Sequence, residues 1–114
     1  MNAKEKELEE KIGHVPVFFR ELASSDPQMH EAVLKIDNYV WADGKISRKN
    51  KKLMAIAIAS ALRDDNALKA QLAGAKKLGL TIEEVDEALR VAFMLSGMPA
   101  YVHGKYAANE TFKS

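Results

Sequence analysis

The chain has 114 residues, of which 47% are hydrophobic, 29% charged and only 7% aromatic, and it contains no cysteine. This length and composition predict one soluble globular domain over residues 1–114 with a mainly aliphatic core. The lack of cysteine excludes disulfides, thiolate nucleophiles and cysteine metal sites, and a net charge of +1 provides no general field for nucleic acid or an anionic membrane.

The first two predicted helices differ in how firmly they should be anchored. Asn2 can cap a helix over residues 3–12 that Gly13 ends, and since Leu8 and Ile12 are its only spaced apolar residues, we expect it to lie on the surface or fray. A short helix follows from Val15 to Ala23, with Pro16 in its first turn. Its apolar residues recur at helical spacing and should dock firmly: Val15, Phe18, Phe19 and Leu22.

A third helix is predicted to begin near Ser24–Pro27, where Ser25 or Asp26 can act as the cap and Pro27 suits the first turn. One stripe of apolar residues at three- and four-residue steps should face the core: Met29, Val33, Ile36 and Val40. The Asp43-Gly44 pair ends this helix in a turn.

The segment from Lys51 to Gly79 predicts a helical hairpin at the centre of the fold. Ser47 caps its first helix, which starts with basic residues and continues as an apolar run from Leu53 to Leu62. A helix that is apolar on every face is expected to be buried on every face. That run is about half as long as a membrane span requires. Asp64, Asp65 or Asn66 caps the second helix, and Gly79 ends it.

Two further helices complete the predicted fold. Thr81 and Glu84 form a capping box, and the inner stripe of the helix that they begin is Val85, Leu89 and Ala92. From Val91 to Leu95 this helix is apolar on all sides, which indicates contact with another subunit. The break at Gly97–Pro99 precedes a last helix. Since no segment alternates with a period of two, we expect an all-α bundle of about six or seven helices and no sheet.

Several of these features occur in a set order: the lead helix KKLMAIAIASAL, the hairpin break, A-x-x-x-G-L-T-x-E-E-x-x-E-A-L from Ala75 to Leu89, and SGMPA from Ser96 to Ala100. Together, over residues 51–102, they resemble the carboxymuconolactone decarboxylase / alkylhydroperoxidase D-like family. The resemblance implies that family's helical fold and a homo-oligomer, commonly a trimer or a hexamer.

The resemblance also identifies chemistry that this chain lacks. Redox-active members carry a Glu, two Cys and a His, and counting back from Gly79 places the equivalents at Lys52, Asp64, Ala67 and Gln71. Without cysteine, a cysteine-dependent peroxidase is excluded. The decarboxylase branch keeps the His as its acid/base group, and the amide of Gln71 cannot exchange protons at neutral pH. A decarboxylase-like lyase therefore has no support at this position.

The candidate site residues can be interpreted in two ways. Lys52, Asp64 and Gln71 converge in the family fold, so they could form a polar pocket that binds a small carboxylate or a water, with Lys52 as the cation. Alternatively, Asp64 is a helix cap, Lys52 is solvated and Gln71 is a satisfied amide. His103 is either a surface or interface residue or a displaced general base that faces the same cavity as Gln71.

The remaining polar and aromatic residues favour no further site. His14 and His30 have no partner at ligand spacing, so we assign no metal and no cofactor. Trp41 is more typical of core packing than of ligand stacking. The basic run over residues 45–52 lacks the interleaved aromatic residues typical of nucleic-acid binding. It therefore indicates a solvent-exposed helix face, and we expect no nucleic acid as a partner.

Two functions remain open from the sequence. One is a cofactor-free enzyme or small-carboxylate binder, and the other is a non-catalytic homo-oligomeric protein for interaction or scaffolding. An enclosed pocket with converging polar groups near Asp64 and Gln71 would favour the first. The N-terminal residues are charged throughout and unlike a secretory signal, so we expect a cytoplasmic location.

Overall fold

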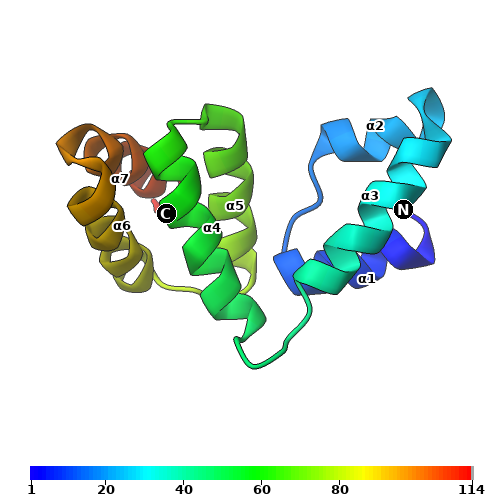
Figure 1. Ribbon diagram of the computed structural model, residues 1–114, viewed down its shortest axis with the longest axis horizontal. Helices are drawn as coiled ribbons and strands as arrows, with labels where there is room; N and C mark the ends of the chain where they lie inside the picture. Colours follow the sequence, from blue (N-terminus) through cyan, green and yellow to red (C-terminus); the bar gives the residue numbers. More distant parts are fainter. Residues whose placement is uncertain (114) are drawn as a thin grey trace.

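The computed structural model describes residues 1–113, which form seven α-helices and no strand (Figure 1). The all-α fold predicted from the sequence is therefore confirmed. In chain order the helices are α1 (Ala3–Ile12), α2 (Val17–Ser25), α3 (Pro27–Val40), α4 (Arg48–Leu62), α5 (Asp65–Lys77), α6 (Ile82–Ser96) and α7 (Met98–Phe112).

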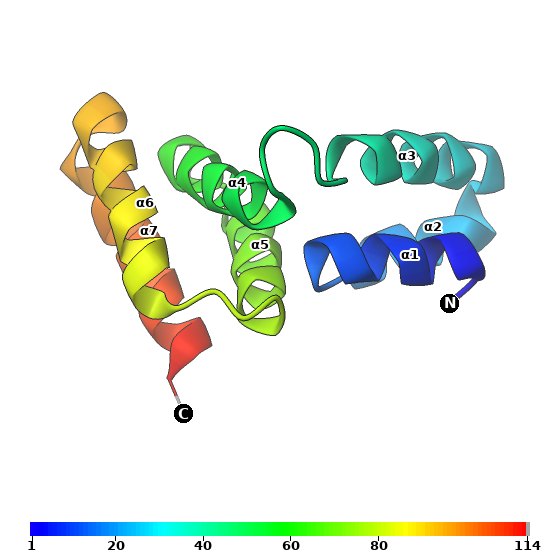
Figure 2. The same ribbon diagram turned by 90° about the horizontal axis from the view of Figure 1, so that it is seen from below.

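The helices form two groups that lie side by side, α1–α3 on one side and α4–α7 on the other (Figures 1 and 2). The hairpin of α4 and α5 lies between α6–α7 and the N-terminal group, and α1 contacts both of its helices. Each group has its own apolar core. The N-terminal core consists of Leu8, Ile12, Val15, Phe19 and Leu34, and the larger core consists of Ile56, Ala59, Leu68, Leu72, Ala75, Leu80, Val85, Leu89 and Ala108.

Local signals in the sequence predicted the helix ends well. Asn2 and Thr81 each form a capping box, with Glu5 and Glu84 respectively. The Ser47 side chain accepts a hydrogen bond from the backbone N–H of Asn50. In the same way, Asp26 accepts from the N–H of Met29 and Asp64 from the N–H of Ala67. A cap satisfies backbone donors that a helix leaves unpaired, so these signals act without help from the rest of the fold.

The N-terminal helices differ from the sequence prediction. α1 does not fray on the surface, because Leu8 and Ile12 are buried and Glu5 is buried with them, 3.5 Å from Nε2 of His30. The second helix begins at Val17 instead of Val15, and Pro16 is its cap. Phe18, expected in the core, has 77% of its surface exposed, because only Phe19 of this pair faces α3.

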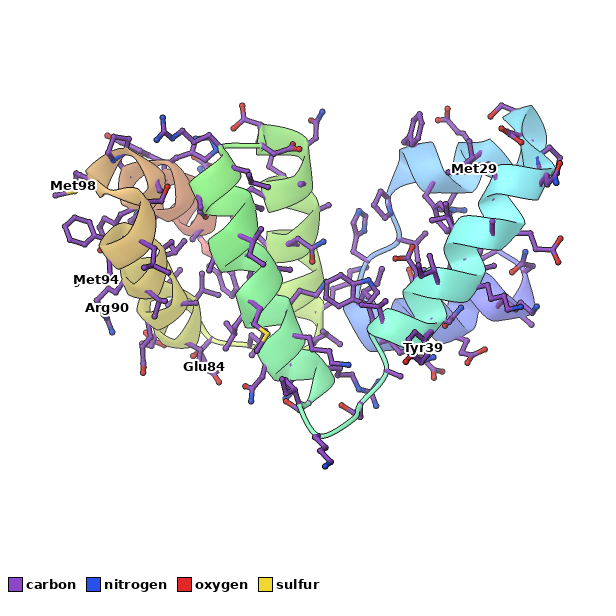
Figure 3. The ribbon with its side chains drawn as sticks, viewed as in Figure 1. Met29, Tyr39, Glu84, Arg90, Met94 and Met98 are labelled. Atoms are coloured by element: carbon purple, nitrogen blue, oxygen red, sulfur yellow. The ribbon has the colours of Figure 1, made fainter. Side chains whose placement is uncertain are left out.

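Most of the apolar stripe predicted to bury α3 faces outwards. Met29, Ile36 and Val40 are exposed, and His30 and Leu34 face the core. Of the predicted stripe, Val33 alone packs against the N-terminal core. Figure 3 shows Met29 and Tyr39 at opposite ends of this outer side. The inner side is more polar because it makes specific bonds to α1, such as those of Asn38 with Lys11 and Lys4. Most of the apolar stripe is thus a surface that the single chain leaves uncovered.

Within one chain, α4 is not buried on every face, contrary to the sequence expectation. Its inner side is buried and carries Lys52, Ile56, Ala59 and Ser60. The opposite side is exposed at Met54, Ile58 and Leu62, the last with 74% of its surface accessible. On α6, Ala92 is buried while Val91 and Leu95 are exposed. One chain of this size has helices enough to cover only one side of α4.

The basic residues at the start of α4 hold the α3–α4 connection. Lys51 Nζ donates to the carbonyl oxygens of Val40 and Ala42, at 2.8 and 2.7 Å. Arg48 pairs with the carboxylate of Asp43 and donates to the carbonyl of Glu10. These bonds satisfy backbone acceptors in the last turns of α1 and α3 and just after α3, which explains basic side chains where the helix dipole disfavours them.

None of the helices within residues 1–113 is both long and apolar enough to span a lipid bilayer.

Candidate functional site

The candidate site is built around a buried lysine. Lys52 lies one turn into α4, and only 2% of its surface is exposed. Its Nζ donates a 2.8 Å hydrogen bond to Oε1 of Gln71 on α5 and lies 5.1 Å from the centre of the Trp41 ring at the end of α3. Three segments therefore meet at the ammonium. Its contacts are a hydrogen bond to a neutral amide and a cation–π contact with an aromatic ring.

Asp37 is the carboxylate that acts on this lysine. Its Oδ1 accepts a 3.2 Å hydrogen bond from Nε1 of Trp41, and burial raises the pKa of Asp37 above its ordinary value. Among residues 1–113, no carboxylate lies within ion-pair distance of Lys52. Burial consequently lowers the pKa of Lys52 from 10.5 to about 8, and the charge of Asp37 opposes this shift only partly.

A glycine leaves room for the lysine head group. A Cβ at Gly74 would lie 3.0 Å from Lys52 Nζ and would overlap the carbonyl oxygen of Ile12 at the end of α1. Gly13, with a positive φ of 83°, approaches the backbone of Gly74 equally closely. The end of α1 thus packs backbone to backbone on α5 and closes over Lys52.

An open groove of about 870 Å³ lies beside this cluster. Its apolar wall includes the exposed side of α4. Its polar groups come from Tyr39, Trp41, Asp43, Lys51, Asp64 and Gln71. Oε1 of Gln71 is engaged by Lys52, whereas its Nε2 has no partner within residues 1–113 and is not sealed from solvent. The bond from Lys52 fixes the orientation of the Gln71 amide. The amide nitrogen remains free to donate a hydrogen bond to a molecule in the groove.

The sequence-derived candidates divide between two places. Lys52 and Gln71 are hydrogen-bonded, and Gln71 and Asp64 line the same groove. Asp64 acts as a helix cap, with Oδ1 accepting the N–H of Ala67 at 3.0 Å, and Lys52 is buried instead of solvated. His103 does not line this groove. It lies in a separate hollow, 3.1 Å from Oδ1 of Asp65.

Sequence reasoning missed Asp37, Trp41 and Gly74 as parts of this cluster. The four-residue spacing of Asp37 and Trp41 on one helix face was an available signal for their hydrogen bond. Nothing in the sequence indicated that Gly74 packs against the end of α1.

Among residues 1–113, no three His, Asp or Glu side chains are grouped so that they could hold a metal ion.

The comparisons with known proteins agree with this fold. The sequence profile of the carboxymuconolactone decarboxylase family matches residues 27–110. The chain therefore belongs to the carboxymuconolactone decarboxylase family, and the match extends well beyond residues 51–102, where the motifs lie.

The relatives include two uncharacterized proteins of Methanocaldococcus jannaschii. MJ0742 is 36% identical over 76 residues, covering 66% of this chain and 73% of the relative. MJ1511 is 30% identical over 76 residues, covering 67% and 71%. The "uncharacterized protein 4 in cox locus" of Paracoccus denitrificans is 29% identical over 87 residues, covering 76% and 78%.

A crystal structure of a Burkholderia xenovorans LB400 protein, assigned as a carboxymuconolactone decarboxylase, has the same fold. It superimposes with a TM-score of 0.74 at 19% identity, over 95% of this chain and 92% of that one. At this identity the likeness is one of fold alone.

Proposed function

We propose that this protein is a cofactor-free member of its family that binds a small carboxylate in the groove lined by Trp41, Asp64 and Gln71. The observation that carries the proposal is the buried ammonium of Lys52, whose single hydrogen bond goes to the amide of Gln71. A buried cation without a close counter-ion is destabilising, and an anionic ligand nearby would supply the missing charge.

Gln71 connects the lysine to the ligand. Because its oxygen accepts from Lys52, its nitrogen can donate to a carboxylate in the groove, and the positive charge behind the amide strengthens that bond. Asp64 uses Oδ1 as the helix cap, which leaves its second oxygen as an acceptor for a ligand hydroxyl. The groove therefore suits a short hydroxy acid better than an uncharged molecule.

Lys52, a catalytic candidate from the sequence, does not line the groove. Because it is buried and donates to Gln71, it would act on a bound ligand by positioning that amide. Gln71 cannot exchange protons near neutral pH, so the proposal is one of binding.

Binding of glycolate, followed by the backbone amide signals of the whole chain in ¹H–¹⁵N NMR spectra, tests the proposal. We expect saturable shifts at Gln71, Trp41 and Asp64, and no such shifts with the neutral analogue ethylene glycol. Gln71→Leu should weaken glycolate binding at least tenfold. Gln28→Leu, which makes the same change on the exposed side of α3, is the matched control and should bind as the unaltered chain does.

Equal binding of glycolate and ethylene glycol, or unchanged binding by Gln71→Leu, would contradict a carboxylate site at this groove.

A second function, homo-oligomeric interaction or scaffolding, is favoured by the amount of exposed surface. The chain exposes 7216 Å², whereas a monomer of 12.6 kDa is expected to expose about 6,200 Å². The difference is comparable to what one partner buries in a standard interface. The exposed surface on the outer sides of α3, α4 and α6 includes many large apolar side chains.

We infer that the side of α4 that carries Met54, Ile58 and Leu62 contacts another copy of this chain. Light scattering at micromolar concentration should give the mass of an oligomer, a trimer or a hexamer, for the unaltered protein. Ile58→Glu should reduce the mass toward that of one chain, while Lys35→Glu, on an exposed and polar position of α3, should not. A monomer before any substitution would refute the inference.

A further inference from the structure

A second hollow, of about 890 Å³, lies at the end of the molecule where α4, α5 and α7 meet. It is lined by Arg63 of the α4–α5 connection and Asp65 at the start of α5, whereas the groove described above is lined by Leu62 at the end of α4 and Asp64 of the connection. The two concavities therefore flank this connection and share no lining residue. One wall of the hollow comes from α7 and is largely apolar, with Met98, Pro99, Val102 and Tyr106. Figure 3 shows Met98 at this outer end.

His103 lines this hollow beside Asp65. Nε2 of His103 is shielded from solvent, and Oδ1 of Asp65 lies 3.1 Å from it. The second ring nitrogen, Nδ1, has no hydrogen-bond partner within residues 1–113. The contact between Nε2 and Asp65 is short but lacks hydrogen-bond geometry, so Nε2 is buried without a hydrogen-bond partner. Nδ1 is the ring nitrogen that remains open to a ligand.

The hollow is lined by two carboxylates, Asp65 and Glu110, and by two cations, Arg63 and Lys69. Glu110 is paired with Lys113, which lies outside the lining, and Asp65 lies beside the imidazole of His103. Arg63 and Lys69, which also line the hollow, make no ion pair or side-chain hydrogen bond within residues 1–113. Two free cations beside an apolar wall complement an anion that carries an apolar body.

Arg63 also occupies an unfavourable backbone conformation. With φ of 56° and ψ of 38° it is the one residue other than glycine with a positive φ among residues 1–113. Glycine is the usual residue at such a helix end because it has no steric penalty there. An arginine at this position therefore has a cost to the fold, which a role for its side chain would explain.

We propose that this hollow is a second ligand site, which binds a monocarboxylate with an aromatic or branched apolar body. The guanidinium of Arg63 and the ammonium of Lys69 bind the carboxylate, the α7 wall contacts the apolar body, and Nδ1 of His103 bonds to a polar group of the ligand. The site is independent of the small-carboxylate groove at Lys52.

Titration of the whole chain with benzoate, followed by the side-chain ¹⁵N signals of His103 and Arg63, tests the proposal. We expect benzoate to shift both sets of signals saturably. Benzyl alcohol has the same ring without the charge, and inorganic phosphate has charge without the ring, so each should bind at least tenfold more weakly. Lys52→Met should leave benzoate binding here within twofold, which separates this site from the groove.

Two substitutions of Arg63 separate its side chain from its backbone. Arg63→Gln removes the charge, and Arg63→Gly removes the charge and the backbone strain. Both should weaken benzoate binding at least tenfold, while Arg63→Gly melts at the same temperature as the unaltered chain or higher, so its loss of binding is not caused by unfolding. Arg90→Gln, on the exposed side of α6, is the control for loss of one positive charge and should bind within twofold.

Equal binding of benzoate and benzyl alcohol would show an apolar hollow without an anion site and would overturn the proposal. Undiminished binding by the two Arg63 variants would overturn it as well.

Discussion

Replacing Lys52 with methionine is expected to stabilise the fold near neutral pH. Lys52 is buried, and its ammonium has one hydrogen bond and no close carboxylate. Methionine has a similar volume and carries no charge that must be removed from water. Exchange of a buried charge for a well-packed apolar side chain of that size is often neutral or stabilising.

The size and the pH range of this effect follow from the pKa of Lys52. Because burial lowers it from 10.5 to about 8, the unfolded chain binds more protons than the folded chain between these two pH values. The free energy of unfolding of the unaltered protein therefore rises with pH across that range. A pKa shift of this size corresponds to a loss of about 3 kcal/mol in the free energy of unfolding. This loss is present in full below the folded-state pKa of Lys52.

Urea denaturation of both proteins at several pH values between 7 and 10 measures the effect. The Lys52→Met protein should be more stable at pH 7 by about 1–2 kcal/mol, since it loses the bonds to Gln71 and Trp41 as well as the charge. Its advantage should shrink as the pH rises and the native lysine becomes neutral. Lys35→Met, at an exposed position, is the control and should show no such trend. A difference that stays constant with pH would contradict the lowered pKa.

The sequence predicted helix ends better than helix faces, and the reason is physical. A cap such as Asn2 or Thr81 acts through bonds to residues three positions away, so its signal is complete within a short segment. Which side of a helix is buried depends on which other helices are available to cover it. On α3 three of the four predicted stripe residues are exposed, while His30 and Leu34 are buried, so periodicity alone selected mostly the wrong face.

The same distinction applies to the candidate site. The family resemblance, with its positions counted back from Gly79, identified Lys52 and Gln71, which are hydrogen-bonded although 19 positions apart in sequence. The contacts that bury Lys52 come from Trp41 and from the end of α1. No local pattern records them, because they depend on how the N-terminal group docks on α5.

Gly74→Ala tests that docking directly and is expected to be strongly destabilising. The new Cβ would overlap the carbonyl oxygen of Ile12 and lie 3.0 Å from Nζ of Lys52. Since the overlap is with backbone, rotation of a side chain cannot relieve it, and the end of α1 must move away from α5. We expect a loss of about 3 kcal/mol, the upper range for overpacking a core position.

The local consequence should be visible as well as the global one. If α1 moves off α5, the amides near Ile12 and Gly13 should exchange hydrogen faster in Gly74→Ala, while those of the larger core around Leu72 stay comparatively protected. Gly44→Ala is the matched control, because a Cβ there meets no atom within 4 Å, and it should change the stability by less than about 0.5 kcal/mol. Equal stability of the Gly74→Ala and Gly44→Ala proteins in urea would mean that α1 does not pack on α5 through backbone contact, and the enclosure of Lys52 would then need another cause.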